Sequence, residues 1–280
     1  MHPLNHPAIL RLIATALEED LGRGDVTTLA TIPPDRTAQG KITAKADLTI
    51  AGLPIVEQVL HAADPTAGVR LLVTEGSTVK KGQVVLELWG NAAGLLIAER
   101  TLLNFLQHIS GVATLTRKFV DALAGTQCKI IDTRKTLAGF RVLDKYAVTQ
   151  GGGTNHRMGL DDGILIKDNH IAVCGGVGAA VRQARNRASA LLRIEVECTT
   201  LAEVQEAIDA RADIILLDNM TTPQMADAVR LVRGRALLEA SGNMNLERVR
   251  EVAETGVDFI SVGALTHSAP AVDLSMAVIV

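Results

Sequence analysis

Short apolar runs recur through the second half of the chain, and they restrict its fold more than any other feature. They are CKIIDT (128–133), GILIKD (163–168), RIEVEC (193–198), DIILLD (213–218), ALLEAS (236–241) and DFISVG (258–263). Between the later runs lie segments with helical spacing: VRQARNRASA, LAEVQEAIDA, TPQMADAVRLVR and LERVREVAETG. Strands that alternate with helices pair in parallel, and near-continuous apolar strands are buried on both faces. The pattern predicts a parallel α/β sheet or barrel.

The first half has a different rhythm. Residues 37–90 combine short alternating runs with one helical segment, LPIVEQVLHAAD, which indicates a small α+β unit. Between the halves, residues 92–125 are typical of one long helix, or of two helices interrupted around Ser110 and Gly111. We therefore expect a first domain over residues 1–110 and a second over residues 111–267.

Composition excludes several classes of function. Aromatic residues make up 2% of the chain and the net charge is −3, so base-stacking platforms and basic nucleic-acid or membrane surfaces are not expected. No apolar stretch reaches the roughly 18 to 20 residues that cross a bilayer, and the N-terminus lacks a signal-peptide pattern. The three cysteines are scattered, which predicts neither a disulfide framework nor a structural zinc site. A reducing cytoplasm fits best.

Positive charge is concentrated in one segment of this mildly acidic chain. Six cations stand against three aspartates between residues 134 and 167; they are Arg134, Lys135, Arg141, Lys145, Arg157 and Lys167. Arginine offers a planar fork to carboxylate or phosphate, lysine offers a point charge, and Gly151, Gly152 and Gly153 would let backbone amides approach a ligand. The segment indicates an anionic ligand; the alternative is a solvated basic loop.

Polar side chains stand at or near the ends of the predicted strands. They are Asp132, Thr133, Arg134, Lys135, Lys167, Asp168, Glu195, Glu197, Asp218, Asn219, Glu239, Ser241 and Ser261, and Gly263 follows the last of them. The carboxyl ends of barrel strands form one mouth, which is where barrel enzymes place their active sites. Glu195 and Glu197 are two apart and face the same side, so each needs a cation or a ligand hydroxyl. Lys135 and Lys167 are the available cations; a closed ion-pair network without a ligand is the alternative.

Three further patterns carry weaker signals. GGVGAAV (175–181) lacks the full dinucleotide-binding pattern and is expected to be a loop that opens a helix. EGSTVKKGQVVLEL (75–88) is similar to a carrier-domain hairpin, with Lys45 or Lys81 as attachment points, but it lacks the carrier tip motif and is expected to be structural. His156, Asp168 and His170 have no recognised metal-ligand spacing, so Mg²⁺ brought by a phosphate ligand is the better interpretation.

A set of motifs in combination resembles one family. The motifs are EDLGRGDVTT, TRKT, QGGGTNHR, DDGILIKDNHI, EVEC, LLDNM, EASGN and ISVGALTHS. The chain resembles the quinolinate phosphoribosyltransferases, also called nicotinate-nucleotide pyrophosphorylases (carboxylating), from Glu19 to Ser268. The resemblance implies an N-terminal α/β sandwich, with residues 268–280 as a candidate to rejoin it, and an incomplete six-stranded α/β barrel. It also implies a homodimer in which Arg100 of the ERTLLN helix reaches into the partner's site; further assembly is left open.

The family reaction joins quinolinate to phosphoribosyl pyrophosphate (PRPP), giving nicotinate mononucleotide, pyrophosphate and CO₂ on the de novo route to NAD. By resemblance, Arg134, His156, Arg157 and the partner subunit's Arg100 hold the quinolinate carboxylates. Lys135 and Lys167 neutralise the pyrophosphate and sugar region, and Glu197 and Asp218 stabilise charge on the ribose, with Mg²⁺ carried by PRPP near these two carboxylates. The catalytic residues are thus Lys135, Glu197 and Asp218. The remaining substrate-binding residues are Thr133, Ser241, Gly242, Asn243, Val262, Gly263 and Ala264, of which the serine, asparagine, alanine and glycines would hold the 5-phosphate.

Three rival functions stay open. A paralogous group associated with molybdate-transport operons shares the fold and several motifs, so a pyrophosphorylase-like enzyme acting on another ligand is the nearest rival. A barrel aldolase would use Lys167 or Lys135 as a Schiff-base amine, although neighbouring carboxylates raise rather than lower a lysine pKa. A carrier or scaffold domain built on the EGSTVKKGQ hairpin is the non-enzymatic alternative. Intact KDNH, TRK and HR motifs favour quinolinate.

Overall fold

The computed structural model describes residues 3–279, and it confirms the predicted mixed α/β architecture. Two compact units make up the chain. One contains the chain up to Arg117, together with Thr136–Gly152 and the residues from Leu265 onward; the other contains Lys118–Lys135 and Gly153–Ala264. These contact-based units are not the sequence-based domains, whose boundary at residue 110 stays a prediction.

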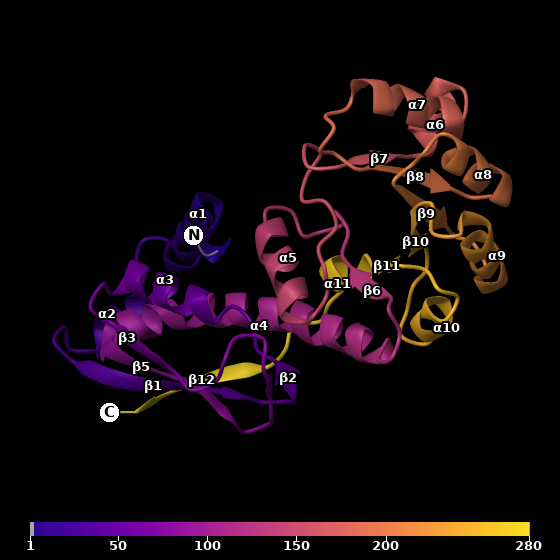
Figure 1. Ribbon diagram of the computed structural model, residues 1–280. Coiled ribbons are helices and arrows are strands. Elements are labelled where there is room, and N and C mark those ends of the chain that lie inside the picture. Colours follow the sequence, from indigo (N-terminus) through magenta and orange to yellow (C-terminus); the bar gives the residue numbers. More distant parts are fainter. Residues whose placement is uncertain (1–2, 280) are drawn as a thin grey trace. The chain divides into compact units, whose positions relative to one another are not determined.

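The second unit contains a parallel sheet of six strands in the order β6-β11-β10-β9-β8-β7 (Figure 1). The strands are β6 (Lys129–Ile131), β7 (Ile164–Ile166), β8 (Ile194–Cys198), β9 (Ile214–Asp218), β10 (Leu237–Ser241) and β11 (Phe259–Ser261). Each lies within one of the six predicted apolar runs. Among the described residues β6 and β7 stand at opposite ends of this order, so the sheet is an incomplete barrel.

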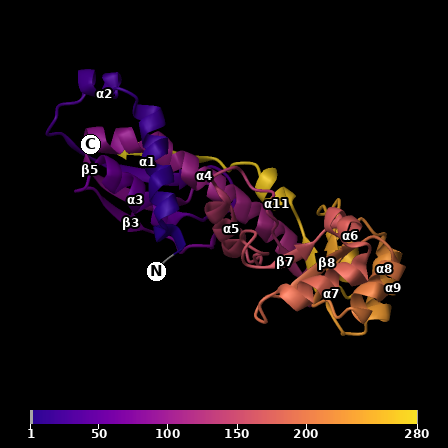
Figure 2. The ribbon, with the colours of Figure 1, turned by 90° about the horizontal axis from the view of Figure 1, so that it is seen from above.

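Helices connect strands β7 to β11. They are α6 (Asp168–Cys174), α7 (Val177–Arg187), α8 (Leu201–Asp209), α9 (Thr222–Val232) and α10 (Val249–Ala253). Helix α11 (Ala264–His267) follows β11, and its residues from Leu265 onward belong to the first unit. Figure 2 shows α6 to α9 gathered at this sheet. The sequence sets where two of them begin, because Thr200 and Thr221 accept hydrogen bonds from the third residue of α8 and α9 in capping boxes. Helix starts are therefore fixed directly behind the strand ends that carry the polar residues.

The first unit is built on an antiparallel sheet in the order β12-β1-β5-β3. Its strands are β1 (Thr37–Ala44), β3 (Gly68–Leu71), β5 (Val84–Asn91) and β12 (Leu274–Ile279), beside the short pair β2 (Leu48–Thr49) and β4 (Thr78–Val79). β12 pairs with β1 from Leu274↔Ala44 to Ile279↔Gln39, so the end of the chain joins the sheet that the N-terminal part forms. The EGSTVKKGQVVLEL segment supplies β4 and part of β5, a structural role as predicted.

The helices of this unit are η1 (Pro3–Asn5), α1 (Pro7–Leu21), α2 (Val26–Thr31), α3 (Leu53–Ala63), α4 (Ala92–Ala122, up to Arg117) and α5 (Arg141–Gln150). Helix α4 is one continuous helix of 31 residues, so the interruption considered at Ser110 and Gly111 is not a break. Both residues have packing roles instead. The Ser110 hydroxyl accepts from the Ala51 N–H (3.0 Å) and donates to the Ala51 carbonyl (3.1 Å). A Cβ on Gly111 would overlap the Pro270 carbonyl oxygen.

None of the helices within residues 3–279 combines the length and apolar character that crossing a bilayer requires.

Candidate active site

A cavity of about 320 Å³ opens among the carboxyl ends of the barrel strands. Its lining is Thr133, Arg134, Lys135, His156, Arg157, Leu165, Lys167, Leu216, Glu239, Ser241 and Ser261. Seven of these are site residues that the sequence predicted, and they come from four separate segments of the chain. The parallel sheet brings them together because all its strands end at one edge. We call this space the mouth cavity.

Four of the six clustered cations line the mouth cavity: Arg134, Lys135, Arg157 and Lys167. The other two do not belong to this unit. Arg141 and Lys145 lie in α5 of the first unit, where Lys145 is fully buried. The concentration of charge along the sequence therefore overstated the charge at the site.

The two arginines present unsatisfied donors. Arg134 Nε and Arg157 Nε are buried, and neither has a hydrogen-bond acceptor within the described part of the chain. Arg157 Nη1 donates to the Gly163 carbonyl at 2.9 Å, which anchors the side chain. Burial lowers the pKa of Arg157, and the neighbouring Arg134 charge lowers it further, against the opposing effect of Glu195 and Asp162. Buried donors without acceptors are costly, so these two guanidinium groups are suited to an anionic ligand.

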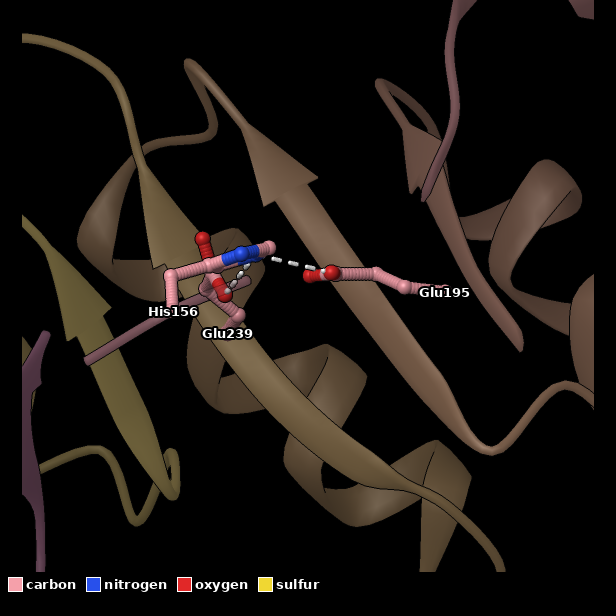
Figure 3. A group of neighbouring side chains, drawn as sticks. All are labelled: His156, Glu195 and Glu239. Atoms are coloured by element: carbon pink, nitrogen blue, oxygen red, sulfur yellow. Dashed lines mark hydrogen bonds and ion pairs between the residues drawn. The ribbon is translucent and has the colours of Figure 1, made fainter. Parts of the chain in front are cut away.

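His156, Glu195 and Glu239 form a cluster, which we call the carboxylate triad (Figure 3); the two glutamates are buried and His156 is half-buried. His156 Nε2 lies 2.9 Å from Glu195 Oε2 and 3.6 Å from Glu239 Oε2. His156 Nδ1 accepts a hydrogen bond from the Arg157 N–H at 2.7 Å. The hydrogen bonds assign the ring proton to Nε2 and leave Nδ1 unprotonated. Both ring nitrogens are engaged by protein, so the predicted bond from His156 to quinolinate needs a local rearrangement and stays a prediction.

The two carboxyl groups of the triad have raised pKa values. Burial is the main cause for both, and the charge of Glu195 raises the pKa of Glu239 well above its ordinary range despite the opposing influence of His156. The sequence placed Glu195 and Glu239 at strand ends but not in the site. The sequence signal that could have indicated their place in the site is an isolated acidic residue inside an apolar run, as in ALLEAS.

Carboxylates also gather beside Lys167. Its Nζ lies 3.7 Å from Glu197 Oε2. Burial raises the pKa of Glu197, the charges of Asp218 and Asp168 add to this effect, and Lys167 opposes it. One lysine therefore does not fully compensate the negative charge here. His156, Asp168 and His170, whose spacing gave only a weak metal-ligand signal in the sequence, do not form such a group: within residues 3–279 the group whose ligand atoms lie within 4.8 Å of one another is the carboxylate triad.

The predicted phosphate loops follow the late strands. Gly242 and Asn243 come directly after β10 with φ of 96° and 51°, and a Cβ on Gly242 would overlap the Asn219 side chain. Glycine is therefore required at position 242 for close packing as well as for its backbone conformation. Gly263 follows β11, and Ala264 begins α11. The Val262 N–H already donates to the Ile131 carbonyl at 3.0 Å.

Gly151 and Gly152 have a different role from the predicted one, while the prediction for Gly153 stays a prediction. The Gly151 and Gly152 N–H groups donate to the Ala147 and Thr149 carbonyls at the end of α5, so they are not open to a ligand. A Cβ on Gly151 would come within 2.6 Å of the Ala113 carbonyl oxygen, which explains the glycine by packing. Arg100 is exposed on α4 in the first unit. GGVGAAV opens α7 at Val177, as predicted.

Comparison with known proteins relates this geometry to one family. Residues 25–110 match the model of the quinolinate phosphoribosyl transferase N-terminal domain, and residues 112–277 match the model of its C-terminal domain. The chain is 42% identical to a probable nicotinate-nucleotide pyrophosphorylase [carboxylating] of Bacillus subtilis, covering 98% of this chain and 94% of that protein. It is 44% identical to a protein of the same description from Synechocystis, covering 94% and 90%.

Solved structures agree in fold. The nicotinate-nucleotide pyrophosphorylase from Francisella tularensis superposes with a TM-score of 0.94 at 39% identity, covering 98% of each chain. That from Ehrlichia chaffeensis gives a TM-score of 0.91 at 39% identity, covering 96% of this chain and 98% of the other.

Proposed function

The chain belongs to the quinolinate phosphoribosyltransferase family, and from this premise we propose that it transfers the phosphoribosyl group of PRPP to quinolinate in de novo NAD biosynthesis. The products are nicotinate mononucleotide, pyrophosphate and CO₂. The observation that carries the proposal is the pair of buried, unsatisfied Nε atoms of Arg134 and Arg157 at the mouth cavity. A dicarboxylate satisfies both guanidinium groups at once, because each can take up a carboxylate with charge-assisted hydrogen bonds.

Phosphoribosyl transfer breaks the bond between ribose carbon 1 and the pyrophosphate oxygen while the quinolinate ring nitrogen forms a bond to the same carbon. Positive charge develops on the ribose, and carboxylates near it stabilise that charge. Glu197, in the last two residues of β8, and Asp218, the last residue of the neighbouring β9, supply these carboxylates. Lys135 and Lys167, which line the cavity, neutralise the charge that accumulates on the leaving pyrophosphate.

Mg²⁺ fits the carboxylates that gather beside Lys167. The donors are oxygens, as Mg²⁺ prefers, and the raised pKa of Glu197 beside Asp218 and Asp168 reflects negative charge that a dication would compensate. We propose that Glu197 and Asp218 hold Mg²⁺ that arrives with PRPP. When bound, the ion neutralises pyrophosphate charge; orientation of quinolinate depends on the arginines.

The oligomeric state and location extend this proposal. We propose a homodimer in which Arg100 contributes to the partner's site, which its exposed position on α4 would allow. The three cysteines are free, in keeping with a reducing cytoplasm. A relative from Arabidopsis thaliana carries the description chloroplastic, so compartments differ within the family.

The deciding assay follows pyrophosphate release from PRPP and Mg²⁺ with and without quinolinate, together with CO₂ from carboxyl-radiolabelled quinolinate. Equal amounts of both products are expected. Folded protein that binds PRPP but releases neither product with quinolinate contradicts the proposal and directs the search to other nitrogen heterocycles.

A further inference from the structure

A second cavity of about 400 Å³ lies in the barrel unit. Ile164, Ile214 and Phe259 line it, and each is the first residue of its strand, whereas Ser241 and Ser261 of the mouth cavity are the last residues of theirs. We call this space the lower cavity. The two cavities therefore lie toward opposite ends of the strands, along the barrel interior.

The side chains that line both cavities are those of the triad region. His156, Arg157 and Glu239 border the mouth cavity and the lower cavity alike. Glu239 is 2% exposed and stands in the middle of β10. The carboxyl group of Glu239 thus lines both the mouth cavity and the lower cavity.

The surroundings of Glu239 indicate that it carries a proton. The polar groups that face it are His156 from the loop between α5 and β7, Glu195 from β8 and Ser261 from β11; its register partner on β9, Leu216, is apolar. Glu195 Oε1 is buried and finds no donor within the described residues unless Glu239 supplies one. Burial and the Glu195 charge raise the Glu239 pKa, which agrees with a protonated carboxyl group at neutral pH.

The proposed reaction needs one proton at this site. When the carboxylate on quinolinate carbon 2 leaves as CO₂, the electron pair of the broken bond stays on carbon 2, which must then take up a proton. His156 is a poor source of this proton, because Nδ1 is an acceptor for Arg157 and loss of the Nε2 proton would leave an imidazolate anion, whereas a carboxylic acid that gives up its proton is left as an ordinary carboxylate. Glu239 borders the mouth cavity directly.

We propose that Glu239 is the general acid of the decarboxylation, and that the lower cavity is the route by which it regains its proton from water. In the step itself the Glu239 O–H bond breaks, a C–H bond forms at carbon 2, and Glu239 is left as a carboxylate. A proton from water in the lower cavity then restores the acid. This inference rests on the proposed function and adds a residue to it.

Glu239→Gln tests the first part, because the amide has nearly the same shape and can still donate to Glu195 but cannot transfer a proton. In a single turnover, pyrophosphate release should stay within about threefold of the wild type, whereas CO₂ release should slow by about 10²- to 10⁴-fold, the usual range for loss of an acid catalyst. Chemical quenching should show quinolinate mononucleotide accumulating. Equal slowing of both products, or no slowing, overturns the assignment.

Two further measurements do not depend on that variant folding. In the wild type, CO₂ release should fall about tenfold per pH unit once Glu239 deprotonates, while pyrophosphate release does not follow the same curve; parallel curves contradict the proposal. Ile214→Phe, which fills part of the lower cavity, should leave the first turnover intact and slow later ones, because the acid starts out protonated. Equal first and later turnovers contradict the route.

Two other outcomes would overturn the proposal in different ways. Stoichiometric divalent metal bound by wild type and lost in Glu239→Gln would make the triad a metal site and overturn the acid role. If the wild type releases neither pyrophosphate nor CO₂ from quinolinate and PRPP, the proposed function fails and this inference fails with it.

Discussion

Arg157 offers a direct test of the mouth cavity. Its Nη1 is committed to the Gly163 carbonyl, while its buried Nε lacks an acceptor among the described residues, so a ligand carboxylate has a defined part of the guanidinium to bind. Removing one partner of a buried charged hydrogen-bonded pair costs about 2–5 kcal/mol. Since each 1.4 kcal/mol is about a tenfold change, Arg157→Ala should weaken quinolinate binding by roughly 30- to several-thousand-fold.

Arg157→Lys separates charge from geometry. It keeps the positive charge but loses the planar fork, and one charge-assisted hydrogen bond is worth about 1.5–3 kcal/mol, so about a 10- to 150-fold loss is expected. Calorimetric titration with quinolinate and, separately, with PRPP and Mg²⁺ measures both constants. Arg193→Ala, which removes an exposed arginine at the lower cavity, is the charge-matched control and should leave quinolinate affinity nearly unchanged. Equal losses of quinolinate and PRPP binding in Arg157→Ala would refute the assignment of this arginine to quinolinate.

Three other outcomes are expected. Ser110→Ala should lower the free energy of unfolding by about 1–3 kcal/mol in urea denaturation, because it leaves two buried backbone groups unsatisfied, whereas Ser77→Ala at the surface should not. Glu239 holds its proton more tightly in the folded protein, so its contribution to the free energy of unfolding is full below the unfolded pKa and is lost as the pH rises through the folded pKa. Glu239→Gln should therefore flatten the decline of the unfolding free energy with rising pH. An unchanged slope of unfolding free energy against pH would contradict the raised pKa. Mixing Arg100→Ala with Glu197→Ala subunits should restore part of the activity if sites are shared, since one hybrid site keeps both residues; no recovery despite measured subunit exchange would count against sharing.

The sequence predicted the barrel strands well because their signal is local. A strand buried on both faces must be apolar along its length, and the six runs stand out for that reason. The helix break considered at Ser110 and Gly111 was wrong for an equally physical reason. Ser and Gly are poor helix formers, but here the Ser110 hydroxyl hydrogen-bonds the Ala51 backbone, and the missing Cβ of Gly111 leaves room for Pro270. Such contacts join residues far apart in sequence, so no local pattern reveals them.

The site shows the same division. Charged residues at strand ends could be assigned to one mouth, because parallel strands share their carboxyl edge. The state of the carboxylate triad could not, since it depends on how deeply Glu239 is buried and on which atom of His156 faces which neighbour. Lys145 shows that sequence position alone can also assign a residue to the site wrongly: it belongs to the cationic segment, yet it is fully buried in the first unit.

The charges of the mouth cavity determine the class of ligand but not its ring. Four cations line it, and a protonated Glu239 adds no negative charge, so the cavity is positive in a chain whose formal charge is −3. Any polyanion benefits from that potential, including ligands of a related pyrophosphorylase. The cavity must therefore distinguish a pyridine dicarboxylate from another anionic heterocycle by the shape of the ligand ring. Leu165 and Leu216 are the apolar side chains that line the mouth cavity, so the flat ring has to pack against these two leucines while the arginines hold its carboxylates.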